Sequence, residues 1–501
     1  MERNEKDTEK EQPIKPVKEE ESFDFFAEET PKKENGETVA NEKTEREKID
    51  AEIGEKTEAN NGLDGEKKRT RRNRRIIACA LSVAFLGVGF LGGYGTYAAL
   101  LDPEMRSLIW AKKQIDRHYI EELTDEDFYG AIRESVNGLF DPYSYYYSEA
   151  EYAAVLQSAT GQWIGMGLRF LTADETGKEQ LLVTMVSGNS PAERANIQTG
   201  TYVIGFGASQ DSVKESESYT ALTEFLSGYG AGEEFVLKLR VGKTGEVYYQ
   251  PIAMESFVEN YVFYRSKDTS YSFVGEKATE KQPNGKVLSA LDQDTAYIRL
   301  TEFNGAAAEE FGQAMSVFKA EKKKNLILDL RMNGGGYMNI LSEIASYFCK
   351  DSKAKRPLIA VAVDKDGDEE VFHASANRYS EYFSADSKIS VLADNSTASA
   401  SECLIGCLYD YKAIGFEDVY LAYRGGEART FGKGIMQTTY PKALFSLSDA
   451  IKLTTAEIFW PVSGKSIHGV GVTETDGAQT LAENYFGDAE VEEAIAKILG
   501  V

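Results

Sequence analysis

The chain has 501 residues, of which 42% are hydrophobic, and its formal charge at pH 7 is −25. This length predicts roughly two to four domains, and the apolar content is sufficient for a sizeable core. The negative charge argues against a nucleic-acid partner, because a phosphate backbone requires a basic surface, and the four cysteines are too few for a disulfide framework.

The N-terminal 75 residues have the composition of a disordered segment. Residues 1–66 carry 22 acidic and 11 basic side chains and show no sustained apolar period. Such a segment cannot bury enough apolar surface to offset the entropy of ordering it. Residues 67–75, KKRTRRNRR, then place seven positive charges in nine positions. We therefore expect a disordered tail over 1–75 that ends in a basic cluster.

An uncharged apolar stretch follows directly, over residues 76–101. It is long enough to cross a bilayer, which takes about 20 apolar residues, so we expect a transmembrane helix. The basic cluster before it places the N-terminus in the cytoplasm by the positive-inside rule, and the rest of the chain outside the cell membrane. A cleaved signal peptide fits less well, because its apolar core would be shorter and closer to the start of the chain.

Two further segments precede the most informative part of the sequence. Apolar residues at helical spacings predict amphipathic helices within residues 102–157, with a break at Asp141-Pro142. Residues 158–256 contain short β-type runs, including LLVTMV and the alternating EEFVLKLRV, and one helical run, YTALTEFLS. This pattern predicts a small β domain.

Within this segment, two motifs resemble those of a PDZ domain. The run Ile164, Gly165, Met166, Gly167, Leu168 is similar to the loop that binds a peptide carboxylate, and SPAERANIQTG is similar to the turn that follows. The resemblance implies a groove in which a peptide C-terminus adds to a sheet edge. Asn196 and Thr201 replace the Gly and Asp of the family pattern, so a β domain without a peptide groove remains an alternative.

The segment 257–482 has the pattern of an α/β domain. The apolar runs TAYIRL, NLILDL, LIAVAV and KISVLAD alternate with helical stretches, as expected for a largely buried sheet. Two loops after these runs are rich in small residues: residues 331–336, RMNGGG, and residues 395–402, NSTASASE. The remaining residues, 483–501, are predicted to form a C-terminal helix.

The second loop offers the parts of a nucleophilic site. Ser399 precedes a predicted helix, where free backbone N–H groups and the helix dipole favour an anion. The amide of Ala400 could hold an oxyanion, and Gly335 or Gly336 could bring a second N–H to the same place. Taken singly, Ser399 could instead be a helix cap and the glycines a flexible turn.

A serine nucleophile needs a base, and the chain contains only three histidines. Lys433, in RTFGKG, is the better candidate, because burial can leave a lysine amine neutral. Gln437 follows four residues later in the strand-like IMQTTY, where alternation predicts the same face as Lys433. A phosphate-binding P-loop does not fit, because Glu427 and Gly434 occupy positions that this motif reserves for Gly and for Ser or Thr.

The motifs LILDLRMNGGG, TASASE, TFGKGIMQT and IKLTTAEIFWPVSGKSIHGVGV, in this order and after GLFDPYS, resemble those of the carboxyl-terminal processing, or tail-specific, peptidases. The resemblance implies a multidomain α/β and α+β fold with a PDZ-like β domain and a crotonase-like peptidase core. It also implies a Ser399–Lys433 dyad assisted by Gln437. The stretch 416–427 makes the connection between Ser399 and Lys433 longer than is usual in the family.

The resemblance also implies an oxyanion hole that comprises Ala400 and the glycines Gly335 and Gly336. It implies further that the PDZ-like domain captures substrate C-termini and gates the catalytic site. We therefore expect a membrane-anchored serine endopeptidase that acts on polypeptides with exposed C-terminal tails without cofactor or metal. A homo-oligomer is one form of assembly open to it. A catalytically inactive PDZ-type binding protein of the membrane is the main alternative. An acyl-CoA enzyme on a related scaffold fits poorly with an outward-facing domain.

Overall fold

The computed structural model describes residues 102–500, except 121–122, 174–176, 275–279, 284–285, 352, 424–426, 444–446 and 484–487. The tail predicted over 1–75 and the transmembrane helix predicted over 76–101 lie outside these residues. Among the helices of the described part, none combines the length and the apolar content needed to cross a membrane.

The chain divides into two compact units at residue 137. The described part of the first unit consists of α2 (Pro103–His118) and nearly all of α3 (Asp125–Asn137), as the apolar spacing predicted. Asp102 caps α2 by accepting a hydrogen bond from the N–H of Glu104 at 2.8 Å. Thr124 caps α3 through its hydroxyl, which accepts from the N–H of Asp127 at 3.1 Å.

The second unit begins with a segment that leads to the small β domain. After the predicted break come a short strand, β1 (Tyr145–Tyr147), which the sequence pattern did not predict, and α4 (Glu149–Ser158). Ser148 and Glu151 form a capping box at the start of α4. Strands β2 (Gln162–Gly165) and β9 (Glu255–Val258) then pair antiparallel. In the sequence, β2 comes directly before the β domain and β9 directly after it.

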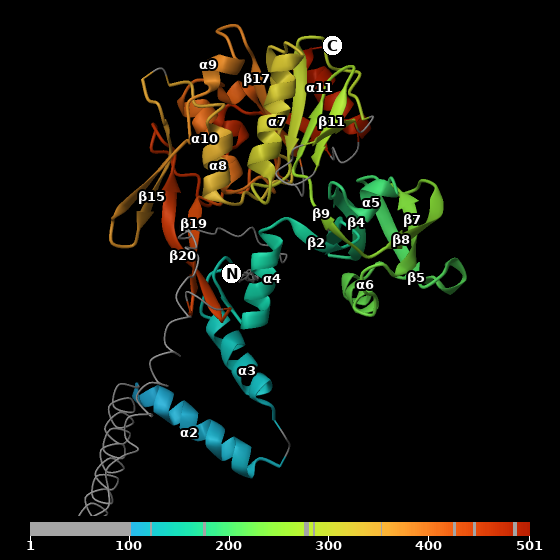
Figure 1. Cartoon of the computed structure of the whole chain (residues 1–501), viewed down its shortest axis with the longest axis vertical. Helices are drawn as coiled ribbons and strands as arrows, with labels where there is room; N and C mark the ends of the chain where they lie inside the picture. The colour runs from blue at the N-terminus through green and yellow to red at the C-terminus, as the bar shows by residue number, and fades with distance from the viewer. Residues whose placement is uncertain are drawn as a thin grey trace, which may run out of the picture. The chain divides into compact units, whose positions relative to one another are not determined.

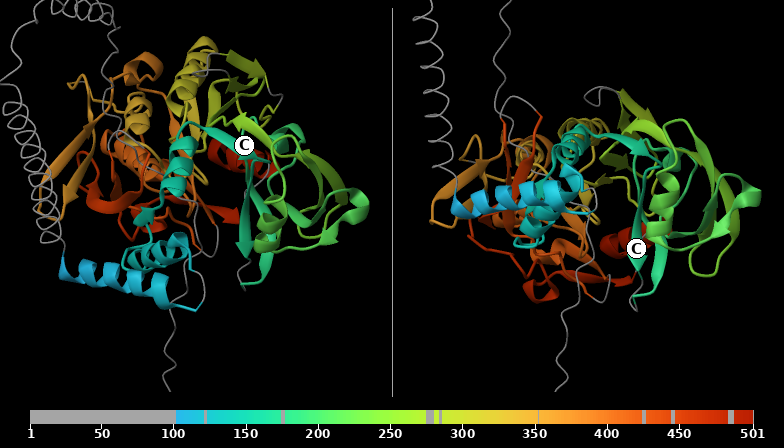
Figure 2. Two further views of the ribbon diagram at one scale, coloured as in Figure 1. Left: turned by 60° about the horizontal axis from the view of Figure 1, so that its bottom comes forward. Right: turned by 90° about the horizontal axis from the view of Figure 1, so that it is seen from below.

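The β domain contains one antiparallel sheet of order β3-β4-β5-β7-β8, with β6 paired to β5. Its elements are β3 (Leu168–Ala173), β4 (Glu179–Val186), α5 (Pro191–Arg194), β5 (Thr201–Gly207), β6 (Lys214–Glu215), α6 (Tyr219–Leu226), β7 (Glu234–Val241) and β8 (Val247–Ala253). Figure 2, in which this segment is green, shows the strands curving around one interior. Alternate residues of β7, namely Phe235, Leu237 and Leu239, fill that interior, as the period of two predicted.

The largest sheet has eight strands in the order β12-β11-β10-β13-β14-β17-β18-β21. The last five strands of this order run parallel, and the first three are antiparallel. The strands are β10 (Val262–Arg265), β11 (Ser270–Val274), β12 (Glu280–Pro283), β13 (Thr295–Leu300), β14 (Asn325–Asp329), β17 (Ile389–Ala393), β18 (Val419–Tyr423) and β21 (Gln479–Glu483).

Helices cover both faces of this sheet. Ile298 and Leu300 of β13 point into the main core with α7 (Ala307–Ala320), α8 (Met338–Ala345) and α10 (Ala400–Asp410), which Figure 1 shows grouped on one side. Tyr297, between those two positions, packs instead with the C-terminal helix α11 (Asp488–Leu499). The alternation explains why these strands are apolar throughout, since each is buried on both faces.

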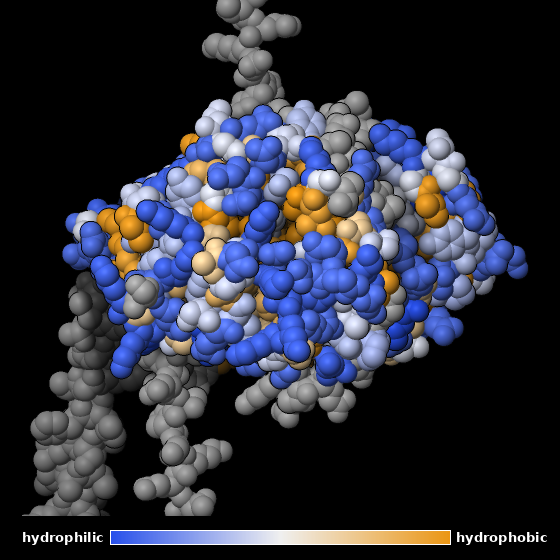
Figure 3. Space-filling view, turned by 90° about the horizontal axis from the view of Figure 1, so that it is seen from above, coloured by the Kyte–Doolittle hydropathy of each residue, from blue (hydrophilic) through white to orange (hydrophobic). Residues whose placement is uncertain are grey.

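A second sheet of five strands contains β1, β15 (Leu358–Asp364), β16 (Glu369–His373), β19 (Ile435–Pro441) and β20 (Ala450–Phe459). The run LIAVAV is β15, so it is a strand as predicted but does not belong to the parallel sheet. Much of the long stretch 416–427 is β18, a strand of the large sheet. Figure 3 shows a mostly hydrophilic face of the molecule, on which apolar side chains form separate small groups.

Candidate functional site

Ser399 lies at the turn between β17 and α10, immediately before the first helical residue. Its backbone has φ 54° and ψ −116°. A positive φ is unfavourable for a residue with a Cβ, so the surroundings must hold this conformation against strain of about 1–3 kcal/mol. The same arrangement, a serine on a sharp strand-to-helix turn, exposes the hydroxyl in other nucleophile turns. Ser399 is half-buried, so its side chain is accessible.

The glycine loop packs directly against this turn. A Cβ added to Gly335 would lie 2.7 Å from the Cβ of Ser399 and 2.9 Å from the nitrogen of Ala400. Gly335 and Gly336 also have φ of 106° and 134°. Only glycine therefore satisfies both the space and the backbone conformation at Gly335. The predicted proximity of the two loops is confirmed by these contacts.

Two backbone N–H groups near Ser399 have no acceptor among the described residues. They belong to Ala400, at the start of α10, and to Gly336. The N–H of Gly335, in contrast, donates to Oδ1 of Asn333 at 2.9 Å. Of the three residues predicted for an oxyanion hole, Ala400 and Gly336 thus retain a free donor and Gly335 supplies the close contact.

Side chains from the two loops fix their relative position. Asn333 is fully buried, and its backbone carbonyl accepts from the N–H of Ala398 and from the hydroxyl of Ser401, each at 3.0 Å. The hydroxyl of Thr397 donates to the carbonyl of Leu330 at 2.8 Å. These buried hydrogen bonds join the ends of β14 and β17, which are neighbours in the sheet. The loops are therefore held by the sheet and by each other.

Glu402, in the first turn of α10, connects Ser399 to the segment around Lys433. Its Oε2 accepts from the backbone N–H of Ser399 and from that of Lys433, both at 3.0 Å. Its Oε1 accepts from the hydroxyl of Thr430 at 2.5 Å and from the N–H of Gly432 at 2.8 Å. Because both N–H groups bind the same oxygen at 3.0 Å, the backbone nitrogens of Ser399 and Lys433 are no farther apart than the sum of these two distances.

The same carboxyl group is fully buried. Burial raises the pKa of Glu402 to about 7, against the lowering effect of the four hydrogen bonds that it accepts. Sequence reasoning did not single out Glu402, although Ser399 and Glu402 have the spacing of a capping box, which was a signal for a backbone-binding carboxylate.

Lys433 lies in the loop before β19 and is half-buried. Its Nζ is 4.9 Å from the centroid of the Tyr143 ring. Tyr143 in turn packs edge-on against Phe431, with centroids 6.5 Å apart. An aromatic face stabilises a cation above it, so Tyr143 favours the protonated form of the amine in this arrangement. Tyr143 stands in the GLFDPYS motif, but nothing in that motif indicates that it lies beside the lysine.

Gln437 is buried in β19, and its Nε2 donates to the hydroxyl of Thr454 at 3.4 Å. The regular alternation from which we expected it on the face of Lys433 does not extend over these residues. Lys433 precedes the strand, and the register of β19 on β20 shifts between Met436 and Gln437. A role for Gln437 in orienting the amine stays a prediction.

The predicted peptide-binding run lies where β2 ends and β3 begins. Ile164 and Gly165 close β2, and Leu168 opens β3. The carbonyl of Met166 accepts from the N–H of Ala192 at 2.9 Å, and Gly167 packs so tightly on Ser190 that a Cβ would overlap it. In the part of the chain that the structure describes, the N–H groups of Met166 and Gly167 have no acceptor.

A buried ion pair lies at the end of β14, just before the glycine loop. The guanidinium of Arg331 donates to both carboxylate oxygens of Asp329, at 2.9 and 2.6 Å, and the Tyr297 hydroxyl donates to the same group at 2.5 Å. Burial alone would raise the pKa of Asp329, but Arg331 lowers it to about 2. The pair therefore stays ionised at neutral pH and orients the backbone that leads to Asn333.

Comparison with known sequences agrees with this geometry. The signature of peptidase family S41 matches residues 294–476, a range that contains Ser399, Lys433, Gln437 and the glycine loop. Residues 294–476 are a peptidase family S41 domain. The enzyme is a serine-type peptidase, as the sequence motifs predicted, and the mixed α/β architecture described above is the fold of its S41 segment.

Similar proteins match a longer part of the chain. It is 26% identical over 423 residues to a carboxyl-terminal-processing protease of Synechocystis, covering 80% of this chain and 87% of the relative. It is 27% identical over 377 residues to the carboxy-terminal processing protease CtpB of Bacillus subtilis, covering 75% and 68%.

Solved structures of similar chains were also found. One is a photosystem II D1 C-terminal processing protease, with a TM-score of 0.47, 22% identity and coverage of 80% of this chain and 98% of the other. Another is a putative S41 protease from Bacteroides fragilis, with a TM-score of 0.49, 15% identity and coverage of 78% and 97%.

Proposed function

We propose that the chain is a membrane-anchored serine endopeptidase that cleaves extracytoplasmic polypeptides near their C-terminal tails. Ser399 is the nucleophile, Lys433 the general base and Gln437 an assisting residue. The observation that carries this proposal is the shared acceptor Oε2 of Glu402, which binds the backbone of both Ser399 and Lys433. No other pair of candidate nucleophile and base among the described residues is joined in this way.

The chemistry follows from these groups. The neutral amine of Lys433 takes the proton of the Ser399 hydroxyl, and Oγ attacks the carbonyl carbon of the scissile bond. The negative charge moves to the carbonyl oxygen, where the N–H groups of Ala400 and Gly336 stabilise it. When the C–N bond breaks, Lys433 returns its proton to the leaving amine. Water, deprotonated by Lys433, then hydrolyses the ester on Ser399.

We propose further that the β domain is PDZ-like and that Ile164–Leu168 binds the C-terminal carboxylate of the substrate. The support is the pair of successive N–H groups at Met166 and Gly167, which have no acceptor within the described residues. Successive free N–H groups form a concave site for an anion. An extended peptide at this place could continue the sheet at β3, and gating of the catalytic site by this domain is part of the proposal.

The location of the enzyme belongs to the proposal as well. The apolar stretch 76–101 and the basic cluster before it support a single membrane span with a cytoplasmic N-terminus. A crotonase-like core, assembly as a homo-oligomer and the action on polypeptides with exposed C-terminal tails belong to the same proposal.

A covalent reagent tests the proposed function. The full-length protein, purified in detergent, is incubated with a fluorophosphonate that labels activated serines, and with unstructured polypeptides whose products are analysed by mass spectrometry. We expect label on Ser399 and products that have lost C-terminal segments. An unlabelled Ser399 together with intact polypeptides would instead identify an inactive peptide-binding protein.

Replacing Tyr143 tests its contact with the lysine. Tyr143→Leu removes an aromatic face that is worth about 0.5–1 kcal/mol to a cation at a partly exposed site. The neutral amine should then be available at lower pH, so the acid limb of the pH profile of kcat/KM should move down by about half a unit. Tyr143→Phe keeps the ring and should keep the wild-type limb. An unchanged limb in the leucine variant would contradict a role for the ring.

A further inference from the structure

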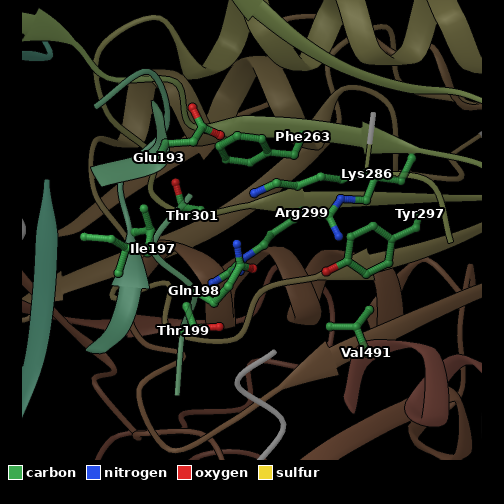
Figure 4. A pocket seen from close by; sticks show the side chains of 12 residues that line it. Glu193, Ile197, Gln198, Thr199, Phe263, Lys286, Tyr297, Arg299, Thr301 and Val491 are labelled. Atoms are coloured by element: carbon green, nitrogen blue, oxygen red, sulfur yellow. The ribbon is translucent and has the colours of Figure 1, made fainter. Parts of the chain in front are cut away.

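A cationic cavity lies away from the proposed catalytic site, between the β domain and the large sheet. Its volume is about 60 Å³. Three basic side chains line it from the sheet side: Arg265, Lys286 and Arg299. Figure 4 shows Ile197, Gln198 and Thr199 of the β domain on one side, with Lys286, Tyr297 and Val491 on the other.

The strand register explains why the basic groups meet. Arg265 pairs with Tyr297, and Phe263 pairs with Arg299, across the antiparallel strands β10 and β13. Cross-strand partners and alternate residues share one face of a sheet. This is the face of Tyr297, opposite to the face of Ile298 and Leu300 that packs on α7 and α8. The two arginines therefore project from the same face of the sheet. Val491, in the first turn of α11, lines the cavity on this face.

Arg299 has a donor that the protein leaves unused. Its Nε is buried and has no hydrogen-bond partner among the described residues. A buried donor without an acceptor is unfavourable, because it has lost its hydrogen bonds to water without replacement. Two nearby carboxylates have other partners, since Asp329 accepts from Arg331 and the Glu193 carboxylate at the rim accepts from the N–H of Asn189 at 2.7 Å. An external acceptor would therefore find donors already in place.

We propose that this cavity binds a tetrahedral oxyanion, namely phosphate or a phosphate monoester group. Guanidinium groups bind such oxygens through paired N–H donors, and the hydroxyl of Thr199, which also lines the cavity, adds an uncharged donor. A volume of about 60 Å³ holds only a few water molecules, at roughly 10–15 Å³ each. One small oxyanion fits this space, whereas a folded domain or a peptide does not.

The bound anion would connect two parts of the enzyme. Gln198 and Thr199 belong to the turn before β5 of the β domain, and Arg299 and Thr301 belong to β13 and the loop after it. An oxyanion between them would be attracted to the positive charges of Arg265, Lys286 and Arg299 at once. Its binding should therefore stabilise the folded state and restrain the Ile197–Thr201 turn.

Calorimetry and thermal unfolding of the full-length protein in detergent test the proposal. The probes are inorganic phosphate, glycerol 3-phosphate as a monoester, acetate and chloride, all at one ionic strength. We expect saturable binding of phosphate with a rise in Tm that chloride does not produce, and slower hydrogen exchange over residues 197–201. Binding of glycerol 3-phosphate in addition would show that the cavity admits monoesters, and its failure to bind would restrict the ligand to the free ion.

Variants locate the effect. Arg299→Gln and Lys286→Met should each weaken phosphate binding at least about tenfold, which is the effect of losing about 1.4 kcal/mol. Lys243→Met removes an exposed cation of the β domain outside the cavity and should bind as the wild type does. Phosphate binding that survives in both cavity variants, an equal effect of chloride, or binding of acetate without phosphate would overturn the proposal. Ser399→Ala should bind phosphate normally, so the test is independent of peptidase activity.

Discussion

Ser399→Ala is expected to lower kcat/KM for polypeptide cleavage by at least about 10⁴-fold, because the reaction then lacks its nucleophile. The alanine keeps the Cβ at the same strained backbone, so the free energy of unfolding should change by less than about 0.5 kcal/mol. The measurement is product formation by mass spectrometry beside a denaturation curve. Ser396→Ala, which changes a side chain three residues earlier in the same loop, should keep nearly full activity.

Ser399→Gly provides a sharper version of the same experiment. Glycine adopts a φ of 54° without strain, so this variant should lose activity like the alanine variant and yet gain about 1 kcal/mol in its free energy of unfolding. A serine that merely capped the helix would give the reverse, with activity retained and stability reduced. Activity within tenfold of wild type in either variant would refute the assignment of Ser399.

Glu402→Gln should have the second largest effect. The carboxylate accepts four hydrogen bonds, and an amide would direct its NH₂ group at two of those donors. Each buried donor left without an acceptor costs about 1–3 kcal/mol, so we expect a loss of about 3 kcal/mol in the free energy of unfolding. Because the backbones of Ser399 and Lys433 then lose their shared anchor, kcat should fall by about 100-fold or more.

The pH dependence distinguishes this role from a simple packing defect. Burial raises the pKa of Glu402 from 4.5 to about 7 in the folded state. The proton is therefore bound more tightly in the folded protein, and the stability from Glu402 is fully present below pH 4.5 and is lost as the pH rises through about 7. Activity should rise over the same range, since only the ionised group accepts all four bonds. Glu402→Gln should abolish both trends, whereas Glu309→Gln, an exposed change on α7, should leave them unchanged.

Local patterns predicted much of the fold. TAYIRL, NLILDL and KISVLAD form neighbouring parallel strands because continuous apolar runs suit strands that are buried on both faces. The same signal in LIAVAV predicted a strand but not its sheet, since β15 pairs with β20 and β16 instead. The hydrophobic pattern of a segment indicates how it is buried, but it does not indicate which strand pairs with it. β1 was missed because three tyrosines in a row show no alternation.

The proximity of Ser399 to the glycine loop follows from two short motifs, whereas the catalytic roles of these residues stay predictions. Ser399 and the glycine loop each follow a strand, and neighbouring parallel strands bring such loops together. Tyr143 could not be found in this way, because its contact with Lys433 depends on the pairing of β1 with β20. For Gln437, the ideal alternation used in the prediction was interrupted by the irregular register of β19.

The pairing of β1 with β20 also affects when the enzyme can become active during synthesis. Ser144 and Thr454, 310 positions apart, are joined when the hydroxyl of Ser144 accepts from the Thr454 N–H at 2.9 Å. A nascent chain that has not yet produced β20 has no partner for β1, so this pairing cannot yet hold Tyr143 near Lys433. Contacts of such long range form late. The proposed catalytic machinery is thus completed only after β20 has been made, so a shorter nascent chain should not cleave its neighbours.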